Sequence, residues 1–178
     1  MSSPSVTPAS PYFLHTARLA FRCWKPDDLP LALELWGDPQ VSRFLGGPFS
    51  PQQISKRLEH EIALMAEFKV QYWPVFLRED DQHMGCAGLR PYKPEEQIFE
   101  IGVHLRPAFW RKGFAEEATN AIADYAFNAL GIKGLFAGHH PDNATSRHLL
   151  AKHGFTYIGD QLYPPTRELH PSYIRMKP

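Results

Sequence analysis

Residues 105–118 read LRPAFWRKGFAEEA and join the end of a strand, a tight turn and the start of a helix. Pro107 and Gly113 mark the turn, and an alanine-rich segment with helical spacing begins directly after it. The first backbone N–H groups of a helix have no partner inside the helix, and the positive end of its dipole lies there. This stretch therefore predicts a binding site for an anionic group, in particular a phosphate.

The segments on either side of this turn predict the centre of the fold. Downstream, apolar residues recur every three or four positions from Lys112 to Leu130, which is typical of a long helix that ends at Gly131. Upstream, apolar runs over 72–77, 84–89 and 98–105 are separated by turn-forming residues. They predict three consecutive antiparallel strands.

The segment before residue 70 predicts one strand and two helices. Alternating residues predict a strand over 16–24, and helical spacing predicts a short helix that ends near Gly37 and a longer one that opens at Ser50. The longer helix carries an apolar stripe that we expect to be buried, with the charged face solvated: Ile54, Leu58, Ile62, Met65 and Phe68.

The C-terminal segment predicts a strand over 135–139, a helix over 143–153 and strands over 155–158 and 172–176. Prolines make the stretch 159–171 a predicted loop. Strands and helices alternate only loosely along the chain, so we expect a mixed, mostly antiparallel α/β sheet in one domain over 12–178. Residues 1–11 are rich in Ser, Pro and Thr and predict a disordered tail.

Composition excludes several classes of function. The 178 residues have a formal net charge of zero, so the basic excess of a nucleic-acid-binding protein is missing. No run approaches the ~18 apolar residues that span a bilayer, and we expect a cytoplasmic protein without membrane contact. Two cysteines predict no disulfide framework, and nine histidines match no zinc spacing, so we expect no metal.

Four motifs, in order along the chain, resemble the GNAT acetyltransferase family. The turn at Trp110–Ala115 is similar to the Arg/Gln-x-x-Gly-x-Gly/Ala sequence with which that family holds the pyrophosphate of coenzyme A. The other three motifs are Thr-x-Arg-Leu-x-x-Arg over 16–22, Glu-Ile-Gly over 100–102, and Asn-x-x-Ser at 143–146 before Lys-x-Gly-Phe at 152–155. The tryptophan before Lys-Gly-Phe-Ala is similar to the RimJ/RimL branch, which acetylates protein N-termini.

The resemblance implies a fold, a donor and a set of residues. It implies a central six- to seven-stranded mixed sheet, mostly antiparallel, flanked by about four helices and splayed where acetyl-CoA binds. Acetyl-CoA is then the acetyl donor, with the thioester and pantetheine arm along Val103, His104 and Leu105. The remaining residues that it assigns to the cofactor are Trp110, Arg111, Lys112, Gly113, Phe114, Ala115, Glu116, Asn143 and Ser146.

The resemblance also implies catalytic residues, each with a plainer alternative. Glu100 is the candidate base, acting through a water, or it pairs with a neighbouring arginine. Many family members carry a tyrosine acid where Leu150 stands, and in the RimJ/RimL pattern the serine of Asn-x-x-Ser takes that part, which implies Ser146. Asn143 and Ser146 are equally compatible with an ordinary helix cap and a first-turn residue.

Arg111 departs from the family, which usually has glycine there. If the position needs a positive φ, the side chain costs about 1 kcal/mol. We hypothesise instead that its guanidinium adds a charge-assisted contact to a phosphate of coenzyme A.

The expected reaction is acetyl transfer to a primary amine, preferably a protein or peptide N-terminus. A small-molecule amine is the alternative acceptor, and a non-catalytic acyl-CoA-binding module is the alternative of another class. The loop 159–171 borders the acceptor by resemblance, and Glu168 in it would favour a cationic amine. Trp36, Phe44 and Trp73 either line an acceptor pocket or belong to the core. The sequence leaves a monomer and a homodimer equally open.

Overall fold

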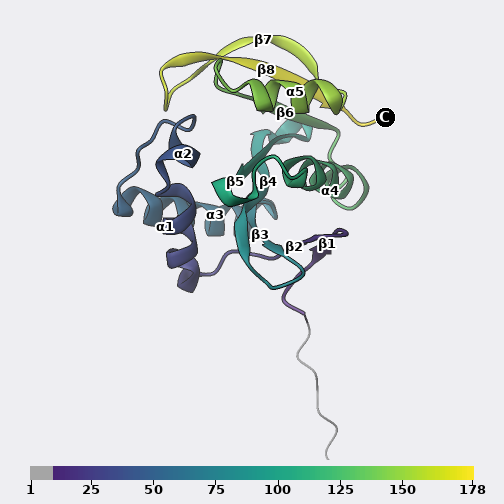
Figure 1. Ribbon diagram of the computed structural model, residues 1–178. Helices are drawn as coiled ribbons and strands as arrows, with labels where there is room; N and C mark the ends of the chain where they lie inside the picture. Colours follow the sequence, from purple (N-terminus) through teal and green to yellow (C-terminus); the bar gives the residue numbers. More distant parts are fainter. Residues whose placement is uncertain (1–9) are drawn as a thin grey trace, which may run out of the picture.

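The structure is a computed structural model that describes residues 10–178. The predicted tail over 1–11 therefore lies outside the described residues except for Ser10 and Pro11. One eight-stranded sheet runs through the protein in the order β1-β2-β3-β4-β5-β6-β8-β7 (Figure 1). Its strands are β1 (Leu14–His15), β2 (Leu19–Phe21), β3 (Tyr72–Leu77), β4 (His83–Lys93), β5 (Ile98–Leu105), β6 (Gly134–Gly138), β7 (Thr156–Tyr163) and β8 (Glu168–Met176).

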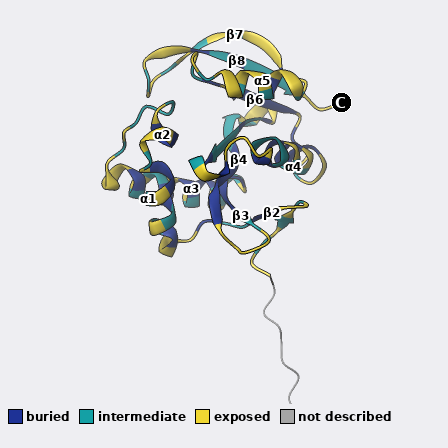
Figure 2. Cartoon of the chain, in the orientation of Figure 1, coloured by how far each residue is buried: buried dark blue, intermediate teal, exposed yellow. Residues whose placement is uncertain are grey.

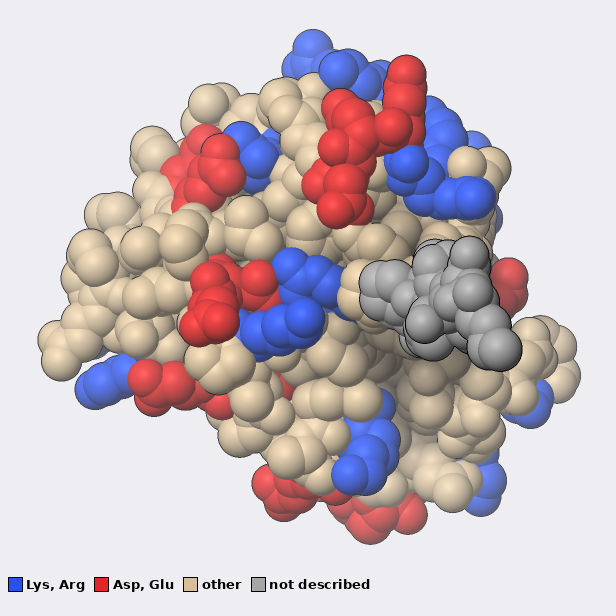
Figure 3. Space-filling view, turned by 90° about the horizontal axis from the view of Figure 1, so that it is seen from below, with Lys and Arg blue, Asp and Glu red and all other residues tan. Residues whose placement is uncertain are grey.

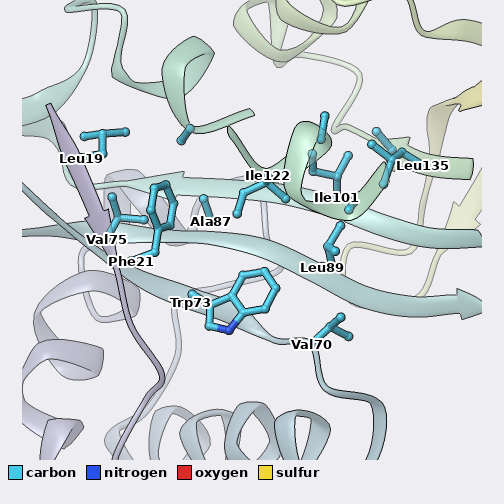
Figure 4. Close-up of a cluster of buried hydrophobic side chains, with 14 of the residues drawn as sticks. Leu19, Phe21, Val70, Trp73, Val75, Ala87, Leu89, Ile101, Ile122 and Leu135 are labelled. Carbon is cyan, nitrogen blue, oxygen red and sulfur yellow. The ribbon is translucent and has the colours of Figure 1, made fainter. Parts of the chain in front are cut away.

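Helices cover both faces of this sheet and leave two apolar cores. The helices are α1 (Leu29–Trp36), α2 (Pro39–Ser42), α3 (Pro51–Phe68), α4 (Phe114–Asn128) and α5 (Ala144–Lys152). One core joins α4 and Leu150 of α5 to the sheet, and Figure 4 shows Ile122 of α4 beside Ala87 and Ile101. The other core joins α1 and α3 to the opposite face, through Tyr72 and Cys86. The sheet is therefore the middle of three layers.

The strands buried between these layers contrast with the edge strand β7 of the C-terminal hairpin. Figure 2 shows the central strands as buried and β7 as largely exposed, whereas most of β8 is intermediate or buried. On the face seen in Figure 3, acidic and basic side chains are interspersed, in keeping with the zero net charge.

The sheet opens in its middle. Every neighbouring pair of strands is antiparallel except β5 and β6, which run parallel. Pairing between β5 and β6 ends at Glu100 opposite Phe136, although β5 continues to Leu105. Beyond that point β6 stays with β8, and β5 stays with β4. The expected splay in a mostly antiparallel mixed sheet is thus confirmed.

Three predictions about the elements were wrong. Of the strand predicted over 16–24, only Leu19–Phe21 forms a strand, β2, and it pairs with a further short strand, β1, that precedes the predicted range. Residues 10–178 thus hold eight strands in place of six to seven. The loop over 159–171 is mostly the hairpin β7–β8, with a turn over 164–167, and Pro171 is tolerated in β8 since its carbonyl still accepts from the His139 N–H.

The buried face of α3 also differs from the predicted stripe. Its buried residues are Ile54, Leu58, Glu61 and Leu64, so the core side of the helix includes a carboxylate. The charged residues of α3 are therefore not all solvated.

Candidate active site

The N-terminus of α4 lacks a side-chain cap. Its N-cap is Gly113 at φ 78°, which no side chain bridges, whereas Ser50 caps α3 and Asn143 caps α5 through their side-chain oxygens. The first N–H groups of α4, on Phe114 to Glu116, are therefore free of a side-chain acceptor. An uncapped helix start of this kind suits an anionic ligand.

The turn before α4 is held in place by its neighbours. Trp110 donates from Nε1 to the Leu105 carbonyl at 2.7 Å, and Lys112 donates from Nζ to the Ala108 carbonyl at 2.8 Å. Arg111 adopts φ 58°, in the left-handed region that favours glycine, so the strain expected for a side chain at this position is present.

The Thr-x-Arg motif near the N-terminus anchors this same turn. Arg18 donates from Nε to Glu117 Oε2 at 2.6 Å and from Nη1 to the Lys112 carbonyl at 3.1 Å. Thr16 donates to Glu117 Oε1 at 2.5 Å. The first turn of α4 is thereby fixed against the segment that joins β1 to β2. The Thr-x-Arg motif and the turn motif, about a hundred residues apart in the sequence, therefore lie together in the structure.

The open edge of β5 presents backbone donors to the gap. The Arg106 N–H donates to the Met84 carbonyl, so the even-numbered residues of β5 bond to β4 and the odd-numbered ones face the other way. The N–H groups of Val103 and Leu105 therefore point toward the gap that opens beyond Glu100. The backbone of His104 is used in pairing with β4, which leaves two rather than three donors of the predicted set.

The predicted residues of α5 lie in its first turn. Asn143 caps the helix, its Oδ1 accepting from the Ser146 N–H at 3.1 Å, and Ser146 is half-buried. Lys152, at the end of α5, donates to Glu116 of α4 at 2.9 Å, so the two helices are tied together. This ion pair lowers the pKa of Glu116, chiefly through the hydrogen bond from Lys152.

Glu100 lies on the opposite face of β5, in a buried polar cluster. Tyr72 donates from its hydroxyl to Glu100 Oε1 at 3.1 Å, and Arg90 packs 4.3 Å over the Tyr72 ring. Arg90 in turn pairs with the fully buried Glu61, which also accepts from the Tyr72 N–H at 2.8 Å. Gly102 makes room for this arrangement, because a Cβ there would lie 2.3 Å from the Tyr72 hydroxyl oxygen.

Burial sets the protonation of this cluster. It raises the pKa of Glu100, an effect that Arg90 and the Tyr72 hydrogen bond partly oppose. Burial also raises the pKa of Tyr72 well above its ordinary value. A carboxyl group with a raised pKa, next to the gap, is suited to accept and release a proton.

The sequence interpretation missed Tyr72, Arg90 and Glu61 as parts of this cluster. The available signal was in α3, where Arg57 and Glu61 lie at helical spacing with buried Ile54, as polar residues on an apolar stripe.

Around the cluster, two of the three aromatics that we considered for an acceptor pocket belong to the core. Trp36 and Trp73 are buried there, and Phe44 lies against the His140 ring instead. Tyr163 of the hairpin is near enough for the charge of Glu100 to raise its pKa, after the larger effect of burial. Glu168 pairs with His140 at 2.6 Å, so its charge has a partner.

Comparison with known proteins settles the family. A family model of the acetyltransferase (GNAT) domain matches residues 18–156. The chain belongs to the GNAT acetyltransferase family. It is similar to an N-acetyltransferase, p20, of Bacillus licheniformis, with 29% identity over 148 residues that cover 82% of this chain and 83% of that one.

Solved structures share the fold. An acetyltransferase from Agrobacterium tumefaciens has a TM-score of 0.79 at 23% identity, covering 99% of this chain and all of its own. RimL, a ribosomal L7/L12 α-N-protein acetyltransferase solved with coenzyme A, has a TM-score of 0.76 at 17% identity, covering 90% and 95% of the two chains. The expected GNAT fold and acetyl-CoA-dependent acetyltransferase class are confirmed.

Between residues 10 and 178, no group of three or more His, Cys, Asp or Glu side chains is placed to hold a metal ion. No helix in that range has the length and apolarity needed to cross a membrane.

Proposed function

We propose that this chain moves the acetyl group of acetyl-CoA directly to a primary amine, preferably the N-terminus of a protein or peptide. One domain over 12–178 would carry the whole reaction. The supporting observation is the opening between β5 and β6 directly after Glu100, with the uncapped N-terminus of α4 following the same strand.

The residues present suit acetyl-CoA. The turn from Trp110 to Gly113 and the free N–H groups of Phe114, Ala115 and Glu116 would hold the pyrophosphate. The Val103 and Leu105 N–H groups would hold the pantetheine arm and the thioester carbonyl, where negative charge develops during transfer. The side-chain NH2 group of Asn143 would donate a hydrogen bond to pantetheine, because the helix cap uses only the side-chain oxygen. Acetyl-CoA supplies the activated acetyl group when bound.

Glu100 and Ser146 would then carry out the proton transfers of the reaction. Glu100 takes a proton from the acceptor ammonium, through a water, and frees the amine lone pair. The amine forms a C–N bond to the acetyl carbon as the C–S bond breaks. Ser146, directly or through a water, gives a proton to the departing thiolate and regains one from the acylated nitrogen, which loses its second proton as it becomes the amide. An α-amine, with a pKa of about 7.7–8.0, needs less help from Glu100 than lysine, at about 10.4, which supports an N-terminal acceptor.

Calorimetry tests the donor site first. We expect acetyl-CoA to bind in the micromolar range and more tightly than ATP, with coenzyme A as the comparison that isolates the acetyl group. Undetectable binding of both acetyl-CoA and coenzyme A would remove the proposed donor site.

An acceptor panel tests the transfer. It contains N-terminal peptides, N-blocked lysine peptides, a polyamine and free amino acids, with coenzyme A release and product mass as readouts. Preference for N-terminal peptides supports the proposal, preference for a small amine supports the alternative, and binding without transfer to any amine supports the non-catalytic module.

Glu100→Gln tests the base. We expect turnover to fall by about 10²–10⁴-fold and the acid limb of the pH profile to move, since general-base catalysis contributes about that much. Glu95→Gln, an exposed carboxylate in the turn before β5, is the matched control. An unchanged profile in Glu100→Gln would refute the assignment.

A further inference from the structure

Among residues 10–178, Arg57 has no side chain that neutralises its charge. It extends from α3, and its Nε atom is sealed from solvent and has no hydrogen-bond partner. The side chain as a whole is only partly buried. Burial lowers the pKa of Arg57, and the charge of Arg90 lowers it further. Within residues 10–178, no carboxylate forms an ion pair with this side chain.

Its neighbours on the same face of the sheet are all paired. Arg90 has Glu61, Arg22 has Asp28, and Arg106 has Glu34. The two carboxylates of the buried cluster have other partners. Glu61 accepts from Arg90 and from the Tyr72 N–H, and Glu100 accepts from the Tyr72 hydroxyl. Within the part of the chain that the structure describes, the guanidinium of Arg57 is therefore left without a counter-charge.

Aromatic rings hold the guanidinium but do not neutralise it. Its carbon lies 4.6 Å from the centroid of the Trp36 ring and 5.9 Å from that of Phe49. Cation–π contacts offset only part of the cost of removing a cation from water. They do fix the plane of the guanidinium, whose N–H groups match both oxygens of a carboxylate.

The location of Arg57 assigns the missing anion to the acceptor. Trp36, over which Arg57 stacks, reaches β5 through its Nε1 atom, which lies 3.3 Å from His104 Nδ1. The His104 ring packs against Tyr72, whose hydroxyl donates to Glu100. The guanidinium therefore lies on the side of β5 that carries Glu100. The phosphates of coenzyme A belong at the N-terminus of α4, and α4 packs on the opposite face of the sheet from α3. An anion beside Arg57 would therefore accompany the amine that is activated by Glu100.

We propose that Arg57 binds a carboxylate of the acceptor, so that the preferred substrate carries an acidic group close to the amine that is acetylated. This inference rests on the proposed function and narrows its substrate class. Two sources can supply the same chemistry: an Asp or Glu side chain next to the N-terminus of a peptide, and the α-carboxylate of a free amino acid. The first source agrees with the N-terminal preference proposed above.

The test compares matched acceptors in the full chain. Peptides that begin Ser-Asp and Ser-Asn, otherwise identical, differ only in the carboxylate, and serine with serinamide separates the α-carboxylate. We expect kcat/KM to be at least about tenfold higher for the acidic member of one pair, because a charge-assisted bidentate contact discriminates by that order. The pair that shows the difference identifies the source.

Variants assign the preference to Arg57. In Arg57→Gln the acidic-to-neutral ratio is expected to fall to near one, while Arg57→Lys keeps part of it. Lys56→Gln, which removes an exposed cation from the same helix, is expected to leave the ratio unchanged. A purely structural role would lower all acceptors equally and keep the ratio.

The outcomes separate this inference from the proposed function. Transfer to neutral and acidic acceptors at equal rates, or an unchanged ratio in Arg57→Gln, overturns the carboxylate site and leaves the acetyltransferase reaction standing. No transfer to any amine overturns the proposed function. In that case the binding of the Ser-Asp peptide to the acetyl-CoA-loaded protein, weakened at least about tenfold by Arg57→Gln, decides the site alone.

Discussion

Removing the carboxylate of Glu61 tests how the buried cluster is held together. Glu61→Ala leaves Arg90 buried without its partner and deprives the Tyr72 N–H of its acceptor. Breaking a buried ion pair by removing one member costs about 3–5 kcal/mol. In a chain of this size each kcal/mol lowers the melting temperature by about 2–4 °C, so we expect a loss on the order of 10 °C.

Two further variants make this measurement specific. Free energies of unfolding come from urea titration followed by tryptophan fluorescence, with calorimetric melting as the second readout. Glu59→Ala, an exposed position on the same helix, should change stability by no more than about 0.5 kcal/mol. The double variant Glu61→Leu with Arg90→Leu should lose less than Glu61→Ala, since no unpaired charge remains buried. Equal losses in Glu61→Ala and Glu59→Ala would refute the reasoning.

Three other perturbations follow from single geometric facts. Gly102→Ala would press a Cβ against Tyr72, so kcat should fall by at least about tenfold as the Glu100 contact is lost, while acetyl-CoA affinity by calorimetry changes little. Burial of His83 is the main reason that its pKa falls to about 4, below the ordinary value. The stability that neutral His83 contributes is therefore present above pH 6.5 and lost as the pH falls toward 4, and the loss between pH 7.5 and 5 is about 2 kcal/mol. In urea titrations at these two pH values, His83→Phe should show a correspondingly smaller drop in the free energy of unfolding. Arg111→Gly relieves a positive φ and should raise stability by about 1 kcal/mol while weakening acetyl-CoA binding and its salt dependence; unchanged affinity would remove the phosphate contact.

The turn and the helix start of the proposed donor site were predictable because their determinants are local. The turn at 107–113 and the helix after it are read from adjacent residues, and a free helix start binds anions whatever surrounds it. The N–H groups available on β5 needed the register with β4, which depends on which strands pair and cannot be taken from the order of residues alone.

The acceptor side was less predictable because its contacts join distant elements. Arg57 and Glu61 come from α3, Tyr72 from β3, and Arg90 from β4. The buried face of α3 was predicted from its apolar residues alone. That prediction placed Glu61 on the solvent-exposed face, whereas the structure buries it. The hairpin β7–β8 was missed for a related reason: prolines argue against strands locally, whereas pairing with β6 secures β8 despite Pro171.

These two sides meet only where the sheet opens. The residues assigned to acetyl-CoA lie at the open edge of β5 and on α4 and α5, while Glu100 and Arg57 lie on the face covered by α1 and α3. An amine that reaches Glu100 from the second face can meet the thioester only through the gap beyond the Glu100–Phe136 pair. Substitutions at Arg111 should therefore act mainly on the KM for acetyl-CoA, and those at Arg57 on the choice of acceptor. The two effects are separate because the sheet lies between the two residues.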